Sequence, residues 1–328
     1  MGQRTFSVFG DSISTFEGIT NPANRIYYQG DLRTSTGVLA PGDTWWSKVI
    51  EHFGGRLLAN ASFSGSLAEG AGFPAGRSPE RIAQIAGPAC TGEAGASPDD
   101  ILVFIGINDF GWAGARAQAA ARSEAMPRCP EALAVPEGEA GPADDGALGR
   151  FADAYSEMLA RMRAAYPAAR VWCLTLLPGR ERGASHPQFA YRLRGIDLDD
   201  YNDVIRLAAA ANGCKVADIR AAGYDYEAAD GTHPTARGME QLAALAVAAM
   251  DAADQARPGD AGTAPASFDA AGVRDTGGTL APEAFAALPE GLFSPAARSG
   301  RPCDEATCFG CAHARGTGNS WSCVCELP

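Results

Sequence analysis

The sequence has no run of about 18 consecutive apolar residues, so it offers no candidate for a membrane-spanning helix. Its most apolar helical stretch, Leu242 to Met250, is too short for that role. The segment from Met1 to Phe9 also lacks the basic start and long apolar stretch of a secretory signal peptide. We therefore expect a cytoplasmic protein that does not insert into membranes.

Positive charge is scarce, because 27 lysines and arginines face 39 aspartates and glutamates, which gives a formal net charge of -12. An acidic chain is poorly suited to nucleic acids and to anionic membrane surfaces. We therefore expect no nucleic-acid partner and a ligand that is neutral or cationic. The same acidity would also serve solubility alone.

Apolar runs and helical periodicities alternate along the first three quarters of the chain. The apolar runs predict five strands, over Thr5–Phe9, Arg56–Ala59, Ile101–Ile105, Val171–Leu177 and Lys215–Ile219. The periodic segments predict five helices, over Thr44–Phe53 with Asp43 as N-cap, Pro79–Ile85, Leu148–Tyr166, Leu198–Asn212 and Pro234–Ala256. This alternation indicates an α/β domain with a mainly parallel five-stranded sheet, helices on both faces, and a ligand site at the strands' carboxyl ends.

Two segments interrupt this pattern. Residues 110–146 are rich in Ala, Gly, Pro and Glu, and we expect a loop or loose helical insertion beside the site. Residues 257–301 are rich in Ala, Pro and Gly and bury too little apolar surface to offset their ordering entropy. We therefore predict a folded domain over 1–256, a partly disordered linker over 257–301 and a Cys-rich tail over 302–328.

Two short motifs carry the residue types of nucleophilic catalysis. Ser12 follows the first predicted strand within Gly10-Asp11-Ser12, and Asp230 precedes His233 by three residues before the last helix. Across a turn, this spacing lets Asp230 hold one imidazole nitrogen while the other accepts the Ser12 proton. Each motif has a plainer interpretation, since Gly-Asp-Ser is also a helix-entry turn and Asp230 or Thr232 can simply cap a helix.

Two more motifs follow predicted strands. Asn108, in Gly106-Ile107-Asn108-Asp109, can aim its amide at the same edge of the sheet, although Gly, Asn and Asp are also ordinary turn formers. Gly65 lies in a loop of small residues after the second strand, where its N–H can approach a ligand closely.

Taken together and in this order, the motifs resemble the four sequence blocks of the SGNH (GDSL-like) hydrolases. The matching segments are Phe9-Gly10-Asp11-Ser12, Ser64-Gly65-Ser66, Gly106-Ile107-Asn108-Asp109 and Asp230-Gly231-Thr232-His233-Pro234. The resemblance implies a flavodoxin-like three-layer α/β/α sandwich and a serine ester hydrolase. It also implies that Ser12 is the nucleophile, His233 the base and Asp230 its orienting group, and that Ser12, Gly65 and Asn108 form the oxyanion hole.

The substrate is less well specified by the sequence. Residues 10–18 and 43–46 resemble a bacterial subgroup associated with carbohydrate esterases, which implies a short acyl group, such as acetyl on a sugar. Aromatic side chains that suit sugar rings or core packing lie nearby, at Phe16, Tyr27, Tyr28, Trp45 and Trp46. The alternatives are a lysophospholipase or thioesterase of the same family, or an inactive binding protein whose tail recruits a protein partner.

Five of the nine cysteines crowd into the tail. The pairs Cys308/Cys311 and Cys323/Cys325 can supply four thiolates to one structural zinc ion, with Cys303 and His313 as spare ligands. Free thiols or a disulfide-linked tail are the alternatives. Catalysis by serine and histidine needs no metal, so we expect no catalytic cofactor.

Overall fold

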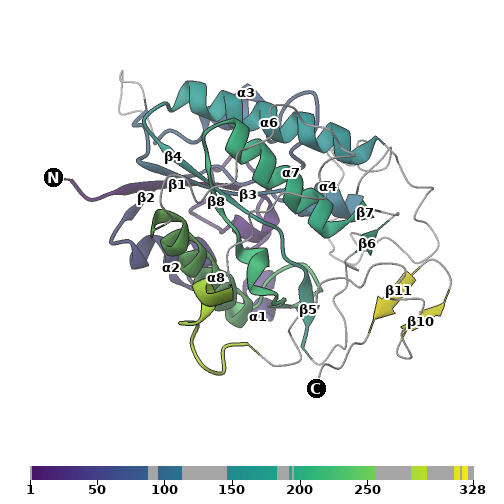
Figure 1. Ribbon diagram of the computed structural model, residues 1–328. Coiled ribbons are helices and arrows are strands. Elements are labelled where there is room, and N and C mark those ends of the chain that lie inside the picture. Colours follow the sequence, from purple (N-terminus) through teal and green to yellow (C-terminus); the bar gives the residue numbers. More distant parts are fainter. Residues whose placement is uncertain are drawn as a thin grey trace.

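A central five-stranded sheet organises the chain (Figure 1). The computed structural model describes residues 2–87, 95–112, 146–182, 192–193, 196–255, 282–293, 314–317 and 320–323. The sheet contains β1 (Thr5–Gly10), β2 (Arg56–Asn60), β3 (Asp100–Phe104), β4 (Arg170–Leu174) and β8 (Lys215–Ala217), in the order β2-β1-β3-β4-β8. Every neighbouring pair is parallel, as the sequence predicts. The carboxyl ends of the strands therefore meet at one edge.

Helices cover both faces of this sheet (Figure 1). One face carries α3 (Pro79–Ala83), α6 (Ala147–Ala165) and α7 (Leu198–Ala211), and the other carries α2 (Trp45–His52) and α8 (Ala236–Gln255). Two short helices, α1 (Asp31–Thr36) and α4 (Ile107–Trp112), lie in the connections. This is the predicted three-layer α/β/α sandwich.

The core lies between the sheet and its helices. All five residues of β3 are buried, which is the consequence of covering a parallel strand on both faces. The largest fully buried side chains include Trp45, Trp46 and Trp172. Phe16, Tyr27 and Tyr28 are also buried, so the aromatic group between residues 16 and 46 packs in the interior and presents no ring to solvent for a sugar.

The first long helix begins one residue later than the sequence predicts. Its N-cap is Thr44, whose hydroxyl accepts a hydrogen bond from the Ser47 N–H. Asp43, the expected cap, instead accepts hydrogen bonds from the N–H groups of Leu39 and Ala40 and closes the preceding 3-10 turn, Pro41–Asp43. Both residues are good caps, and the extra turn decides between them.

Smaller elements complete the description. They are the parallel pair β5 (Gly179–Glu181) and β9 (Tyr226–Ala228), the antiparallel pairs β6 (Arg192–Leu193) with β7 (Ile196–Asp197) and β10 (Ala314–Thr317) with β11 (Ser320–Cys323), and the 3-10 turns Ser12–Ser14, Ile219–Ala222 and Pro282–Phe285. Within the described ranges, no helix has both the length and the apolar character to cross a membrane.

Part of the expected linker is folded onto the domain. Residues 282–293 are described, and the Phe293 ring stacks on Tyr224 at a centroid distance of 4.4 Å. The Leu292 carbonyl accepts hydrogen bonds from Arg237 and Gln241 of α8 at 3.0 and 2.8 Å. This piece therefore extends the folded unit beyond residue 256, whereas residues 256–281 and 294–301 lie outside the described ranges.

Candidate active site

The Ser12 turn follows directly from the end of β1. Asp11 caps the 3-10 turn Ser12–Ser14, and its Oδ1 accepts a hydrogen bond from the Ile13 N–H at 3.0 Å. A Cβ at position 10 would lie 2.5 Å from Ser14 Oγ and 2.8 Å from the Phe104 carbonyl oxygen, so this position requires glycine. The Ser12 N–H is the first of its turn and has no partner within it.

A tight loop after β9 carries Asp230 and His233. A bridge between Ala228 and Pro234 closes this loop, and the Ala229 N–H donates to the His233 carbonyl at 2.8 Å. Asp230 Oδ1 accepts hydrogen bonds from the backbone N–H groups of Thr232 and His233, at 3.1 and 2.7 Å. The backbone of the loop therefore fixes the carboxylate before any side chain contributes.

The structure brings the three predicted side chains into one hydrogen-bonded chain. His233 Nδ1 lies 2.7 Å from Asp230 Oδ2, and His233 Nε2 lies 2.9 Å from Ser12 Oγ. Burial alone would raise the pKa of Asp230, but its hydrogen bonds with the His233 ring and the loop backbone lower that pKa to about 2. An ionised carboxylate only accepts, so Nδ1 carries the proton and Nε2 is free to accept the Ser12 proton.

The other two predicted residues, Gly65 and Asn108, follow the carboxyl ends of β2 and β3. Asn108 lies in the first turn of α4, and its Nδ2 donates to the Ser66 carbonyl at 3.0 Å, which leaves the second amide hydrogen for another acceptor. Gly65 adopts a positive φ of 78°, and its N–H makes no hydrogen bond within the described part of the chain. The Phe63 N–H donates to the Gly10 carbonyl at 3.0 Å, which ties this loop to the Ser12 turn.

Arg81 joins the same segments from inside the protein, a role that sequence reasoning missed. Its side chain is fully buried and donates to the carbonyl oxygens of Gly10, of Ala61 at 3.1 Å and of Pro74 at 2.8 Å. Gly10 leads to Ser12 and Ala61 leads to Gly65. A surface arginine and a buried one look alike in a sequence, so no signal distinguishes Arg81 there.

Two buried carboxyl groups flank the site residues. Burial raises the pKa of Asp11 to about 7 and that of Asp109 to about 8. Hydrogen bonds from the Ile13 N–H to Asp11, and from the Ala68 and Glu69 N–H groups to Asp109, oppose this increase. Asp109, which is next to Asn108 in the sequence, thereby anchors the loop that follows Gly65.

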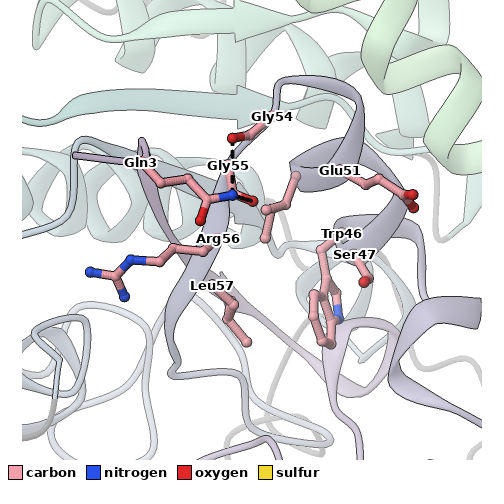
Figure 2. Close-up of a pocket in the computed structure, with 9 residues that line it drawn as sticks. Gln3, Trp46, Ser47, Glu51, Gly54, Gly55, Arg56 and Leu57 are labelled. Atoms are coloured by element: carbon pink, nitrogen blue, oxygen red, sulfur yellow. Dashed lines mark hydrogen bonds between the residues drawn. The ribbon is translucent and has the colours of Figure 1, made fainter. Parts of the chain in front are cut away.

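Two hollows in the described part of the chain differ in their place relative to Ser12. One, of about 370 Å³, lies between α2 and the start of β2, where the Gln3 amide donates to the Gly54 and Gly55 carbonyls (Figure 2). It is at the edge where β1 begins, away from Ser12. The other, of about 450 Å³, is lined by Leu67, Glu69, Gly70, Phe73, Arg77 and Arg150 among others and adjoins the Gly65 loop.

The predicted zinc site falls largely outside the described ranges. Cys303, Cys308, Cys311, His313 and Cys325 are not described, and for Cys323 only its backbone place in β11 is known. Among the residues that the structure does describe, no group of three or more His, Cys, Asp or Glu side chains gathers as metal ligands would. The zinc site therefore stays a prediction.

The chain matches the GDSL-like Lipase/Acylhydrolase family over residues 8–241. This match spans more than half of the sequence, so the chain belongs to this family, as its four motifs predict. It matches none of the curated proteins with which it was compared.

Several solved structures are similar to it. A protein from Bacteroides uniformis described as a GDSL-like lipase shares 25% identity over 74% of this chain and 93% of its own, with a TM-score of 0.48. A Bacteroides ovatus protein with the same description shares 22% identity over 75% and 96%, with a TM-score of 0.47. A Corynascus thermopiles carbohydrate esterase family 2 enzyme with a carbohydrate binding domain shares 18% over 76% and 67%, with a TM-score of 0.43.

Proposed function

We propose that this protein is a serine esterase that acts through Ser12, His233 and Asp230. The observation that carries the proposal is the continuous contact from Asp230 Oδ2 to His233 Nδ1 at 2.7 Å and from His233 Nε2 to Ser12 Oγ at 2.9 Å. These distances suit proton transfer from the hydroxyl to the ring. Membership of an acylhydrolase family supports the same reaction class.

The reaction proceeds in two halves. Ser12 Oγ attacks the ester carbonyl while His233 Nε2 takes its proton, and the ring then protonates the departing alcohol. Water enters and attacks the acyl carbonyl while His233 takes its proton, and the ring then returns that proton to Ser12 Oγ as the acyl group leaves as a carboxylic acid. The N–H groups of Ser12 and Gly65 and the second amide hydrogen of Asn108 stabilise the oxyanion in both halves. No step requires a metal or cofactor.

The substrate that we propose is a short-chain ester, with acetyl on a carbohydrate as the first candidate. Lipid-handling surfaces gather large exposed apolar side chains, whereas Leu39 and Phe73, at 54% and 43% exposed, are the large hydrophobic side chains that stand out from the described surface. The 450 Å³ hollow beside the Gly65 loop is lined by Glu69, Arg77, Arg150 and Asp153 as well as by apolar residues, and these charged groups suit hydroxyl groups. The carbohydrate esterase among the similar structures motivates sugar acetates as test compounds.

The test is hydrolysis of p-nitrophenyl esters of increasing acyl length by wild type, Ser12→Ala and Ser14→Ala. Ser14 lies in the same turn, but its hydroxyl contacts Trp45 instead of His233, so it serves as the matched control. We expect the best turnover on acetate, a loss of about 10⁴-fold or more in kcat for Ser12→Ala, and activity in Ser14→Ala.

Each other outcome changes the proposal in a different way. A preference for long acyl chains would replace the short-chain substrate by a lysophospholipase-type one. Equal turnover by wild type and Ser12→Ala would remove Ser12 from the mechanism. A wild-type protein that neither hydrolyses any ester nor reacts with a fluorophosphonate at Ser12 would be an inactive binding protein.

A further inference from the structure

Tyr27 lies face to face with the ring of His233. The two ring centroids are 3.4 Å apart and the planes differ by 5°. The Tyr27 hydroxyl donates to Asp230 Oδ2 at 3.0 Å, the same oxygen that meets His233 Nδ1 at 2.7 Å. The Tyr27 side chain, 7% exposed, therefore contacts both the ring of His233 and the carboxylate of Asp230.

The backbone of Tyr27 is tied to the Ser12 turn. The Tyr27 N–H donates to Thr15 Oγ1 at 2.9 Å, and that hydroxyl donates to the Ser12 carbonyl at 2.9 Å. Tyr28 anchors the other side, because its hydroxyl donates to the Pro234 carbonyl at 2.9 Å. The segment thus connects the Ser12 turn with the loop that carries Asp230 and His233, and the Tyr27 ring is held in place.

We propose that Tyr27 is a positioning residue for the His233–Asp230 pair, an inference that rests on the esterase function proposed above. When His233 takes the Ser12 proton, the ring becomes a cation, and the face of the phenol attracts a cation. The hydroxyl keeps Asp230 Oδ2 aimed at Nδ1 and shares its negative charge. The two contacts therefore act on the charged state of the ring and on its orientation.

The two contacts affect the protonated ring in opposite directions. Removing the hydroxyl leaves Asp230 with more negative charge for the imidazolium, which stabilises the charged ring. Removing the aromatic face takes away a stabilising contact of that same charged ring. The acid limb of the kcat/KM profile should move to higher pH in Tyr27→Phe, and to lower pH in Tyr27→Leu than in Tyr27→Phe.

Other titratable groups near the pair are Ser12, Asp11, Tyr28 and Tyr226. Burial raises the pKa of Tyr28 and of Tyr226 well above 10, so neither ionises in the working range. Burial raises the pKa of Asp11 to about 7, so Asp11 adds its own ionisation to the profile. Because Asp11 is present in every variant, differences between variants isolate Tyr27.

The experiment measures kcat, KM and the pH dependence of kcat/KM with p-nitrophenyl acetate for wild type, Tyr27→Phe, Tyr27→Leu and Tyr28→Phe. We expect Tyr27→Leu to lose about 10-fold in kcat with little change in KM, which is within the range of a desolvated cation–π contact. Tyr27→Phe should stay within about 3-fold of wild-type kcat while its acid limb moves to higher pH. Tyr28→Phe loses a hydrogen bond to the same loop without touching the pair, and its acid limb should match wild type.

The inference is overturned if both Tyr27 variants keep the wild-type acid limb, or if Tyr28→Phe shifts it equally. A loss confined to KM would also overturn it, because the ring would then contact the substrate. If Tyr27→Leu does not fold, the acid limb of Tyr27→Phe decides. If the wild-type protein hydrolyses no ester and Ser12 does not react with a fluorophosphonate, the esterase function itself is wrong. If wild type is active but the Tyr27 variants show no shift, only the positioning role of Tyr27 is wrong.

Discussion

Replacing Asp109 by asparagine tests whether a carboxyl group buried beside Asn108 keeps its proton at neutral pH. Burial raises the pKa of Asp109 from 3.8 to about 8 against the pull of its backbone hydrogen bonds. Between these values the folded protein holds a proton on Asp109 that the unfolded chain has released, so the stability that Asp109 contributes is greatest below pH 4 and falls until about pH 8. From pH 5 to 8 the loss amounts to roughly 4 kcal/mol at about 1.4 kcal/mol per pH unit.

Asparagine keeps the shape of the protonated carboxyl group and its acceptor for the Ala68 and Glu69 N–H groups, but it cannot ionise. The assay is urea unfolding at pH 5 to 9. We expect Asp109→Asn to exceed wild type only modestly at pH 5, where the unfolded chain has been losing its proton for about one pH unit, and by several kcal/mol at pH 9.

The matched control for this assay is Asp99→Asn. Asp99 is exposed and also accepts from a backbone N–H, that of Thr5 at 2.7 Å. Hydrogen bonds from Thr5 lower the pKa of Asp99, so its replacement should shift stability equally at every pH tested. The burial argument is refuted if the gap between wild type and Asp109→Asn does not widen with pH.

Three further substitutions test separate parts of the site. Arg81→Met leaves three carbonyls without their donor and should lower the free energy of unfolding by about 3–5 kcal/mol in urea. Arg77→Met, at a side chain that is 33% exposed, should cost about 1 kcal/mol or less, and equal losses would contradict the prediction. Asn108→Ala should lower kcat on p-nitrophenyl acetate by about 10²–10³-fold, and a nearly unchanged kcat would remove its oxyanion role. Asp230→Asn should lower kcat by about 10⁴-fold by favouring the wrong tautomer of His233, whereas a small loss would show that the carboxylate charge is dispensable.

The inner strands β1, β3 and β4 were predictable because they are buried on both faces and so read as apolar runs, whereas the edge strands β2 and β8 are only partly buried. The residues at which the strands end were less predictable. The run from Val171 predicts a strand to Leu177, but β4 ends at Leu174. Leu176 and Leu177 are buried, yet the Leu176 N–H bonds the Asn202 side chain at 2.6 Å instead of a neighbouring strand. An apolar run therefore marks burial and does not tell where the ladder stops.

The pairing of β5 with β9 had no local signal. These strands join Gly179–Glu181 to Tyr226–Ala228, segments of three residues that contain charged side chains. Strands this short are fixed by what packs around them, such as the Arg180–Asp225 ion pair at 2.5 Å, and not by their own periodicity. The pair matters for the site because β9 leads directly into the loop with Asp230 and His233.

The residues of the candidate site also differ in this respect: some are recognisable from the local sequence, and others only from tertiary contacts. Ser12, Asp230 and His233 sit in turns whose backbone geometry is written into neighbouring residues, such as Gly10 and the N–H groups that hold Asp230. Tyr27 and Arg81 belong to no such turn. They reach the site through tertiary contacts, because Tyr27 donates to Asp230 and Arg81 donates to the carbonyl oxygens of Ala61 and Gly10. Short motifs in a sequence thus locate the candidate catalytic groups, whereas the side chains that contact those groups from elsewhere follow only from the assembled fold.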